Sequence, residues 1–443
     1  MHPRVIQVPP TGPGSKSTTR APRRRAASAA VIPAIPPPRI ATSTVPLVSC
    51  GSAIPARTLL GSWDDGTVRL PPFRIERWYE RYEFTTELML SSSDCESVTV
   101  QEVLELEPDA GARLGALTLG YTEVPGSHEL RAAVAALYAI VGPADVLTLA
   151  AAEEGIFAVE HAVLGPGDHA VVETPCYESA LAVARSTGAE VDTWTRAYAD
   201  GWGHDLEALE RLLRPDTRFV YVNTLHNPTG LSMPRPVLER IVELCGERGA
   251  VLLCDEVYRE LEHDPETMLP AVCDVYERGI SLGSVSKTYG LPGLRTGWIA
   301  CRDPGLLDAV VAVKLYTTIC SSAPSELLAA VALRHRHRFV ERNHTRVLAN
   351  LALADDVIAR HPELLDWVRP DSSPIGFPRL RVPDSKAFCE GLAAEMGVLL
   401  LPGEVYDEPG HVRFGLGRTG AAEAFARFDA YLGSTSRSSA TSP

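Results

Sequence analysis

The chain has 443 residues, 45% of them hydrophobic and 22% charged, and a formal net charge of −14, which disfavours nucleic acid or an anionic membrane surface as its main partner. This length suits two domains, and no apolar run approaches the ~18 residues that a transmembrane helix needs. The nine scattered cysteines form no CxxC pair or metal-ligand cluster, so we expect a cytoplasmic protein with reduced thiols and no metal.

The N-terminal region differs in composition from the rest. Residues 1–63 contain eight Lys or Arg and no Asp or Glu, so the remainder carries about −22 by subtraction from −14. The region is rich in Arg, Ser and Ala, as transit peptides are, but its eleven prolines oppose the amphipathic helix of such peptides. Residues 1–70 are interpreted as a disordered extension, or as the result of a start codon assigned too early, with a targeting segment as the alternative.

Globular patterning begins near Pro72, and after Gly120 short apolar strands alternate with amphipathic helices. This alternation is typical of an α/β domain with a mostly parallel sheet, and continuous apolar runs indicate strands buried on both faces. The predicted strands are Val146–Leu149, His169–Glu173, Glu190–Thr193, Phe219–Asn223, Val251–Asp255, Ile280–Gly283 and Gly297–Cys301. The predicted helices include Glu129–Tyr138, Glu154–Val163, Glu178–Ser186 and Arg235–Arg248.

The C-terminal third predicts a smaller α+β region. Its predicted elements are a long helical stretch at about Leu327–Arg360, short strands at Gly397–Leu401 and His411–Gly415, and a final helix at Ala421–Leu432. We therefore predict a large domain at residues 111–325 and a small domain built from residues 71–110 and 326–433. The Ser/Thr-rich residues 434–443 are predicted to be a disordered tail.

Four short motifs carry the chemistry. In chain order they are His226-Asn227-Pro228-Thr229-Gly230, Asp255-Glu256-Val257-Tyr258, Ser284-Val285-Ser286-Lys287 and Gly290-Leu291-Pro292-Gly293-Leu294-Arg295. They lie at strand ends, where open α/β sheets bind ligands. Each alone is weak, since Asn-Pro-Thr-Gly is more often just a turn. In this order, residues from Gly120 to about Gly417 resemble the class I/II aminotransferases. The resemblance implies the fold type I architecture, with a seven-stranded, mostly parallel sheet and a small α+β domain, and pyridoxal 5′-phosphate as the cofactor.

The resemblance assigns the cofactor's Schiff base to Lys287, which would also move protons at the substrate Cα. A solvated surface lysine is the ordinary alternative, but Lys287 follows an apolar strand and precedes a Gly-rich turn. Asp255 ends the apolar run Val251–Cys254 and matches the carboxylate that keeps the pyridine nitrogen protonated, with a helix N-cap as the alternative. Tyr258 and Asn227 match the donors to the phenolic oxygen, which should lower the pKa of the Schiff base.

The phosphate is expected to contact Arg295, Ser284 and the helix opened by Ala151-Ala152-Glu153, where Ala152 and Glu153 would offer backbone amides. The family more often has Gly at position 151, so the geometry of this turn departs from the pattern. Tyr177 matches the aromatic residue that stacks on the cofactor ring, although an aromatic residue after proline is more often simple packing.

Two further matches concern the partner subunit and the substrate. Tyr121 matches the tyrosine that reaches the phosphate of the neighbouring subunit, which implies a homodimer with shared active sites. Arg413 matches the arginine that binds the α-carboxylate, a role suited to a planar bidentate donor. The alternative for Arg413 is a surface arginine on an edge strand. Arg379 and Lys314 are the candidates for a second contact with the substrate.

The leading hypothesis for function is a transaminase that moves an amino group from an L-amino acid to a 2-oxo acid. A second is elimination or cyclisation, because Ser91–Ser93, Phe377–Arg379 and Leu401–Gly403 resemble the capreomycidine synthase branch, which cyclises a hydroxylated arginine. Tyr258, kept in the ordinary transaminase arrangement, favours the first. A third, a transcription regulator with an aminotransferase-like domain, is disfavoured because residues 1–70 are too Pro-rich for a winged helix.

Overall fold

The protein is described by a computed structural model that covers residues 70–439, all within one compact unit of the chain, Gly66–Pro443. The predictions made for residues 1–69 and 440–443 lie outside the described residues. Between residues 70 and 439, no helix is both long and apolar enough to cross a membrane.

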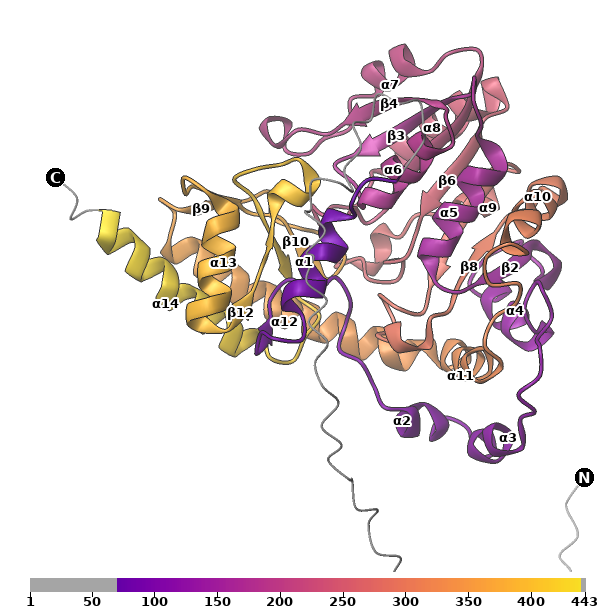
Figure 1. Ribbon diagram of the computed structural model, residues 1–443, viewed down its shortest axis with the longest axis horizontal. Helices are drawn as coiled ribbons and strands as arrows, with labels where there is room; N and C mark the ends of the chain where they lie inside the picture. Colours follow the sequence, from indigo (N-terminus) through magenta and orange to yellow (C-terminus); the bar gives the residue numbers. More distant parts are fainter. Residues whose placement is uncertain (1–69, 440–443) are drawn as a thin grey trace, which may run out of the picture. The chain divides into compact units, whose positions relative to one another are not determined.

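A seven-stranded sheet forms the centre of the large part, in the order β2-β8-β7-β6-β5-β3-β4 (Figure 1). Its strands are β2 (Val146–Leu149), β3 (His169–Thr174), β4 (Glu190–Thr195), β5 (Thr217–Asn223), β6 (Val251–Asp255), β7 (Gly279–Ser284) and β8 (Gly297–Ala300). Neighbouring strands are parallel except at β8, which pairs antiparallel with both β2 and β7. All seven predicted strands are present, with ends within two residues of the prediction, and the predicted sheet is confirmed.

Helices cover both faces of this sheet because the strands alternate their apolar side chains between two cores. In β5, Phe219 and Tyr221 pack into one core while Val220 and Val222 pack into the other. One face carries α5 (Ala152–Val163), α6 (Glu178–Ser186) and α10 (Pro304–Lys314), and the other carries α7 (Leu206–Leu212), α8 (Arg235–Arg248) and α9 (Val272–Val275). The continuous apolar runs in the sequence thus reflect burial on both sides.

The topology brings the motif residues to one edge of the sheet. Asn223 and Asp255 are paired at the carboxyl ends of β5 and β6, and Ser284 ends β7. Because β8 is antiparallel, its first residue, Gly297, pairs with both Ser284 and Leu149. Arg295 precedes β8 and therefore lies at the same edge as the other motif residues.

A separate apolar core holds the small part together, and it includes residues from both ends of the described chain, such as Trp78 and Phe428. Its elements are α1 (Arg74–Tyr82), α12 (Arg336–Arg360), α13 (Ser385–Met396), α14 (Ala421–Ser439) and the short strands β1 (Leu88–Met89), β9 (Leu365–Asp366), β10 (Ile375–Gly376), β11 (Arg379–Leu380), β12 (Val398–Leu399), β13 (Leu401–Pro402) and β14 (Val412–Gly415). Helix α1 also contacts the large part, because Arg74 bonds to Glu178 in α6.

The long helical stretch predicted at Leu327–Arg360 is two helices, α11 (Ala323–Arg334) and α12, separated at His335, where φ is −112° and ψ is 21°. The break lets α11 pack against the sheet with α2 (Val100–Leu104), α3 (Ala110–Ala116) and α4 (His128–Ala135), while most of α12 packs into the small part. Residues 98–110 pack into the same core as α11 and the sheet. We therefore propose that the boundary between the large and the small part lies near residue 96 rather than 110.

Two C-terminal predictions were also inaccurate. The strand predicted at Gly397–Leu401 is divided into β12 and β13, which pair with different neighbours. The tail predicted to be disordered from Ser434 is helical as far as Ser439, because α14 is anchored by buried residues including Phe425 and Leu432, and extending an existing helix is easier than nucleating one.

Candidate active site

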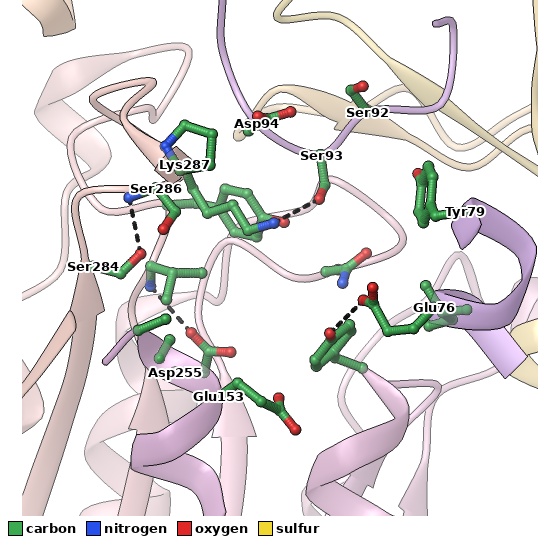
Figure 2. A pocket seen from close by; sticks show the side chains of 18 of the residues that line it. Glu76, Tyr79, Ser92, Ser93, Asp94, Glu153, Asp255, Ser284, Ser286 and Lys287 are labelled. Carbon is green, nitrogen blue, oxygen red and sulfur yellow. Dashed lines mark hydrogen bonds between the residues drawn. The ribbon is translucent and has the colours of Figure 1, made fainter. Parts of the chain in front are cut away.

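A cavity of about 590 Å³ opens at the carboxyl edge of the sheet, between the strand ends, α1 and residues 92–94 (Figure 2). This volume is within the range of about 300–1,000 Å³ that is typical of small-molecule sites. The predicted site residues that line it are Ala152, Glu153, Tyr177, Asn227, Asp255, Tyr258, Ser284, Lys287, Arg295 and Arg413. The structure thus brings together residues that are up to 261 positions apart, from Ala152 to Arg413.

Lys287 projects into the cavity from the loop that follows β7. Its Nζ donates a hydrogen bond to the Ser93 hydroxyl at 2.9 Å (Figure 2). Burial lowers the pKa of the Lys287 ammonium below its ordinary value, although the carboxylate of Asp94 opposes this shift. A buried amine that loses its proton more readily is suited to act as a nucleophile and as a base.

The segment that presents Ser93 is held closely by its neighbours. The Cys95 amide donates to the Lys287 carbonyl at 3.3 Å, and the Ser91 carbonyl accepts bonds from Arg413. A Cβ atom on Gly415 would lie 2.2 Å from the Ser92 carbonyl oxygen, so only glycine allows this close approach. The Ser93 hydroxyl is therefore held in a defined position beside the lysine.

Asp255 is buried at the end of β6. Its carboxylate accepts hydrogen bonds from the Tyr221 hydroxyl at 3.2 Å and from the Val257 amide at 3.1 Å. Burial raises the pKa of Asp255 to about 6. A cation beside this carboxylate would offset its desolvation, so Asp255 fits the role predicted for it, as the partner of a protonated pyridine nitrogen.

The turn before α5 has a backbone that normally requires glycine. Ala151 has φ 100° and ψ 170°, a region almost restricted to glycine, and a Cβ atom on Gly297 would lie 2.5 Å from the Ala151 carbonyl carbon. Glycine, the residue that the resemblance leads us to expect here, would adopt these angles without strain. The helix begins at Ala152, two residues earlier than predicted, and its first amides border the cavity.

Cationic and polar donors surround this helix start. The guanidinium of Arg295 forms no ion pair with any carboxylate of residues 70–439, and Ser284 and Ser286 line the same wall. An unpaired arginine, two hydroxyls and a helix N-terminus are the donor set that a phosphate dianion requires. The residues present therefore fit the phosphate, the ring nitrogen and the aldehyde of pyridoxal phosphate.

Glu153 was predicted to contribute only its backbone. Its carboxyl group accepts a hydrogen bond from the Ser179 hydroxyl at 2.9 Å, and burial raises its pKa to about 7. A carboxyl group that is only partly ionised near neutral pH repels a neighbouring phosphate less than a full carboxylate would.

Arg413 is buried in β14, where its five N–H groups make five hydrogen bonds, all to uncharged oxygen atoms. The acceptors are the Ser91 carbonyl at 2.9 and 3.2 Å, Asn227 Oδ1 at 3.1 Å, the Tyr79 hydroxyl at 2.7 Å and the Tyr406 hydroxyl. No carboxylate within the described part of the chain forms an ion pair with it. A buried guanidinium with only neutral partners favours an incoming carboxylate.

Three further predicted residues, Tyr258, Asn227 and Tyr177, line the cavity. Burial raises the pKa of Tyr258 well above its ordinary value, so it remains a neutral hydroxyl that can donate. Asn227 accepts bonds from Arg413 and Tyr406 through Oδ1, which leaves its amide nitrogen as the donor. Tyr177 donates through its hydroxyl to Glu76 at 2.6 Å, and its ring centroid lies 5.1 Å from that of Phe73.

Three predicted residues do not line the cavity. Tyr121 is 94% exposed, so its predicted role across a subunit interface stays a prediction. The predictions for Lys314 and Arg379 as substrate contacts were wrong. The Lys314 ammonium is buried and donates to the carbonyls of Val124 and Thr148, at 2.5 and 2.6 Å, while Arg379 is exposed on a short strand.

Sequence reasoning missed cavity residues from the N-terminal part of the chain. They include Glu76, Tyr79 and Glu83, on or just after α1. Ser92 and Asp94 also line the cavity, in the segment 91–95 that the resemblance places at the substrate loop of common transaminases. The spacing of Glu76, Tyr79 and Glu83, at i, i+3 and i+7, places them along one helix face and was a usable signal. It was missed because the same spacing is common on solvated helices.

The chain is similar to known proteins over most of its length. Residues 85–426 match the family model for aminotransferase class I and II. The chain is 32% identical to capreomycidine synthase of Streptomyces vinaceus, over 81% of this chain and 92% of that protein. Among solved structures, a PLP-dependent aminotransferase from Streptococcus suis has a TM-score of 0.79 at 34% identity, with 83% of this chain and 98% of that chain covered. The PLP-dependent cyclase OrfR has a TM-score of 0.77 at 30% identity, covering 84% and 98%.

Proposed function

The chain belongs to the class I and II aminotransferase family, and on that premise we propose that it transfers the amino group of an L-amino acid to a 2-oxo acid. The family's cofactor is pyridoxal 5′-phosphate, which when bound supplies an electron-withdrawing ring that stabilises negative charge at the substrate Cα. The observation that carries the proposal is the convergence of Lys287, Asp255 and Arg413 on one cavity.

Each residue has a distinct task in this proposal. Arg413 binds the α-carboxylate and so orients the Cα–H bond toward Lys287. Lys287 takes the proton from Cα, which its lowered pKa favours. Asp255 keeps a positive charge on the ring nitrogen, while Tyr258 and Asn227 donate to the ring oxygen.

Cyclisation is the second candidate, because two of the similar proteins are a capreomycidine synthase and a PLP-dependent cyclase. Both reactions begin with removal of the Cα proton. In a cyclase of the first kind, acting on an arginine-derived amino acid, a leaving group departs from the substrate side chain and a substrate nitrogen forms the new bond. The presence of Tyr258 in the cavity wall, in the ordinary transaminase arrangement, supports transamination.

An amino acid labelled with ¹⁵N at its α-nitrogen distinguishes the two reactions. A transaminase moves the label into the amino acid made from an added 2-oxo acid, and without that acid it stops after one turnover. Repeated turnover without a 2-oxo acid, with the label kept in a cyclic product, would contradict transamination. Lys287→Ala should lower either rate by at least about 100-fold, whereas Lys386→Ala, an exposed lysine outside the cavity, should not.

We further propose a homodimer in which each chain completes the other's site. Two segments, around Thr122 and around Ser321, lie side by side, because Thr122 Oγ1 donates a hydrogen bond to the Ser321 carbonyl at 2.8 Å. Four apolar side chains are exposed on these segments. They are Leu119, Tyr121, Tyr316 and Ile319, exposed by 82%, 94%, 94% and 47%. An exposed apolar surface of this kind is typical of a protein interface.

A further inference from the structure

Helix α1 turns an acidic face toward the cavity. Glu76, Tyr79 and Glu83 line it together, and Figure 2 shows Glu76 and Tyr79 projecting from α1 into the cavity, on the wall opposite Lys287. The hydroxyl of Tyr79 reaches Arg413, the residue proposed to bind the α-carboxylate. Glu76 and Glu83 are therefore neighbours of the proposed amino-acid site and lie outside the proposed cofactor contacts.

The charges of the cavity do not balance at this face. Asp94 already forms an ion pair with Arg418 at 2.9 Å, and Asp255 is assigned to the ring nitrogen. Glu76 accepts a hydrogen bond only from the neutral Tyr177 hydroxyl, and Glu83 has no side-chain hydrogen bond or ion pair within residues 70–439. Once the phosphate takes Arg295 and the α-carboxylate takes Arg413, Glu76 and Glu83 remain without a cation. Glu153 also has only a hydroxyl partner, but burial raises its pKa to about 7, which lowers its charge.

Two further observations indicate that a ligand group belongs here. Ser92 is 5% exposed and lines the cavity, yet its hydroxyl forms no hydrogen bond within the described residues. The Ser92 oxygen is open to the cavity rather than enclosed by protein, so it is free to bond a ligand group at this wall. Burial raises the pKa of Glu83, and the nearby carboxylates of Asp94 and Glu76 raise it further. A cation placed among these groups would relieve their mutual repulsion.

We propose that Glu76 and Glu83 bind a cationic side chain, a guanidinium or an ammonium, of the amino acid whose Cα reacts at Lys287. This inference rests on the proposed function of the site, but it holds for transamination and cyclisation alike. Carboxylates recognise a guanidinium through paired, charge-assisted hydrogen bonds, and the Ser92 hydroxyl can accept one more.

Arginine and citrulline test the proposal because they are nearly identical in shape and differ in side-chain charge. Each is titrated into the cofactor-loaded enzyme, and the dissociation constant is read from the change in cofactor absorbance. We expect arginine to bind about tenfold more tightly than citrulline, as for a partly screened charge-assisted bond. Lysine against norleucine repeats the comparison for an ammonium group.

The double variant Glu76→Gln/Glu83→Gln should bring the two dissociation constants within about twofold of each other. Glu80→Gln is the matched control, because Glu80 lies on the same helix but faces away and pairs with Arg77. It should keep the preference. Adding salt should weaken the binding of arginine more than that of citrulline.

The outcomes separate this inference from the proposed function. If neutral or acidic amino acids change the cofactor absorbance, and arginine and lysine bind no more tightly than citrulline and norleucine, the proposed site for a cationic side chain is wrong while the proposed function stands. If the double variant keeps the wild-type preference, the assignment to Glu76 and Glu83 is wrong. If no amino acid of any charge changes the cofactor absorbance, the proposed function itself fails.

Discussion

At the scale of single residues, the main feature of the site is that its ionisable groups are buried, which shifts their pKa values. Asp255 is the clearest case, because within the described residues its carboxylate accepts hydrogen bonds only from one hydroxyl and one amide. The fold thus keeps this carboxyl group where its charge is unfavourable until a cation arrives. A site that favours binding in this way should be less stable without its ligand.

Asp255→Asn should therefore stabilise the cofactor-free protein above pH 6. The pKa of Asp255 is raised from 3.8 to about 6, so the folded carboxyl group keeps its proton while the unfolded one loses it, and stability falls as the pH rises through this window. This shift corresponds to an upper bound of about 3 kcal/mol. Urea denaturation at pH 4 and pH 8 should show the gain at pH 8 only.

The cofactor-loaded protein should give the opposite result, because the carboxylate then has a cationic partner. There, Asp255→Asn should lower both stability and cofactor affinity. Equal unfolding free energies for the wild type and the variant at pH 8, with and without cofactor, would refute this role for Asp255.

At the scale of elements, the start of α5 shows a local strain at a functional position. Non-glycine residues with the backbone angles of Ala151 carry a strain of about 1–3 kcal/mol. The turn persists because β8 packs directly beneath it, with Gly297 in close contact. The strain keeps the first amides of the helix at the cavity wall.

Ala151→Gly should stabilise the protein by about 1 kcal/mol, since the relief of strain exceeds the loss of one methyl group and the added freedom of the unfolded chain. Ala162→Gly in the same helix, where the backbone is helical, should instead destabilise it by about 1 kcal/mol. Chemical denaturation of both variants measures these effects. A destabilised Ala151→Gly variant would show that the turn is not strained.

At the scale of the whole molecule, the cavity of one chain is lined by every residue predicted for the cofactor, the catalysis and the α-carboxylate except Tyr121. The exposure of this tyrosine fits a residue that acts on a second chain, and its apolar neighbours on the surface fit an interface. A site shared in this way would couple cofactor binding to dimer formation.

Mixed dimers test the shared site. A chain with Tyr121→Phe is combined with a chain with Lys287→Ala, so that each hybrid contains one site free of both changes. Hybrids should regain activity and cofactor affinity up to half the wild-type level, because the intact lysine and the intact tyrosine meet in one site. Both variant chains must fold and associate for the test to count. If their hybrids are then no more active than the Tyr121→Phe parent, Tyr121 lies outside the partner's site.

The sequence by itself determined the sheet, the family and many of the residues that line the cavity. These features depend on short-range patterns: apolar runs mark strands buried on both faces, and the motif residues directly follow those strands. Parallel strands end at the same edge, so motifs with Asn227, Asp255 and Lys287 could be placed together without knowing any long-range contact. The strand ends were accordingly predicted within two residues.

Only the tertiary structure decided which distant segments close the cavity, and where the chain passes from the core of the large part to the core of the small part. Glu76, Glu83 and Ser93 lie about 200 residues before Lys287 and reach it only because α1 and the following segment pack against α6, β14 and the lysine loop. The break at His335 has a similar cause. The residues before it pack into the core of the large part, and most of the buried residues after it pack into the core of the small part. Such choices depend on the balance of packing across the whole fold, which no local pattern encodes.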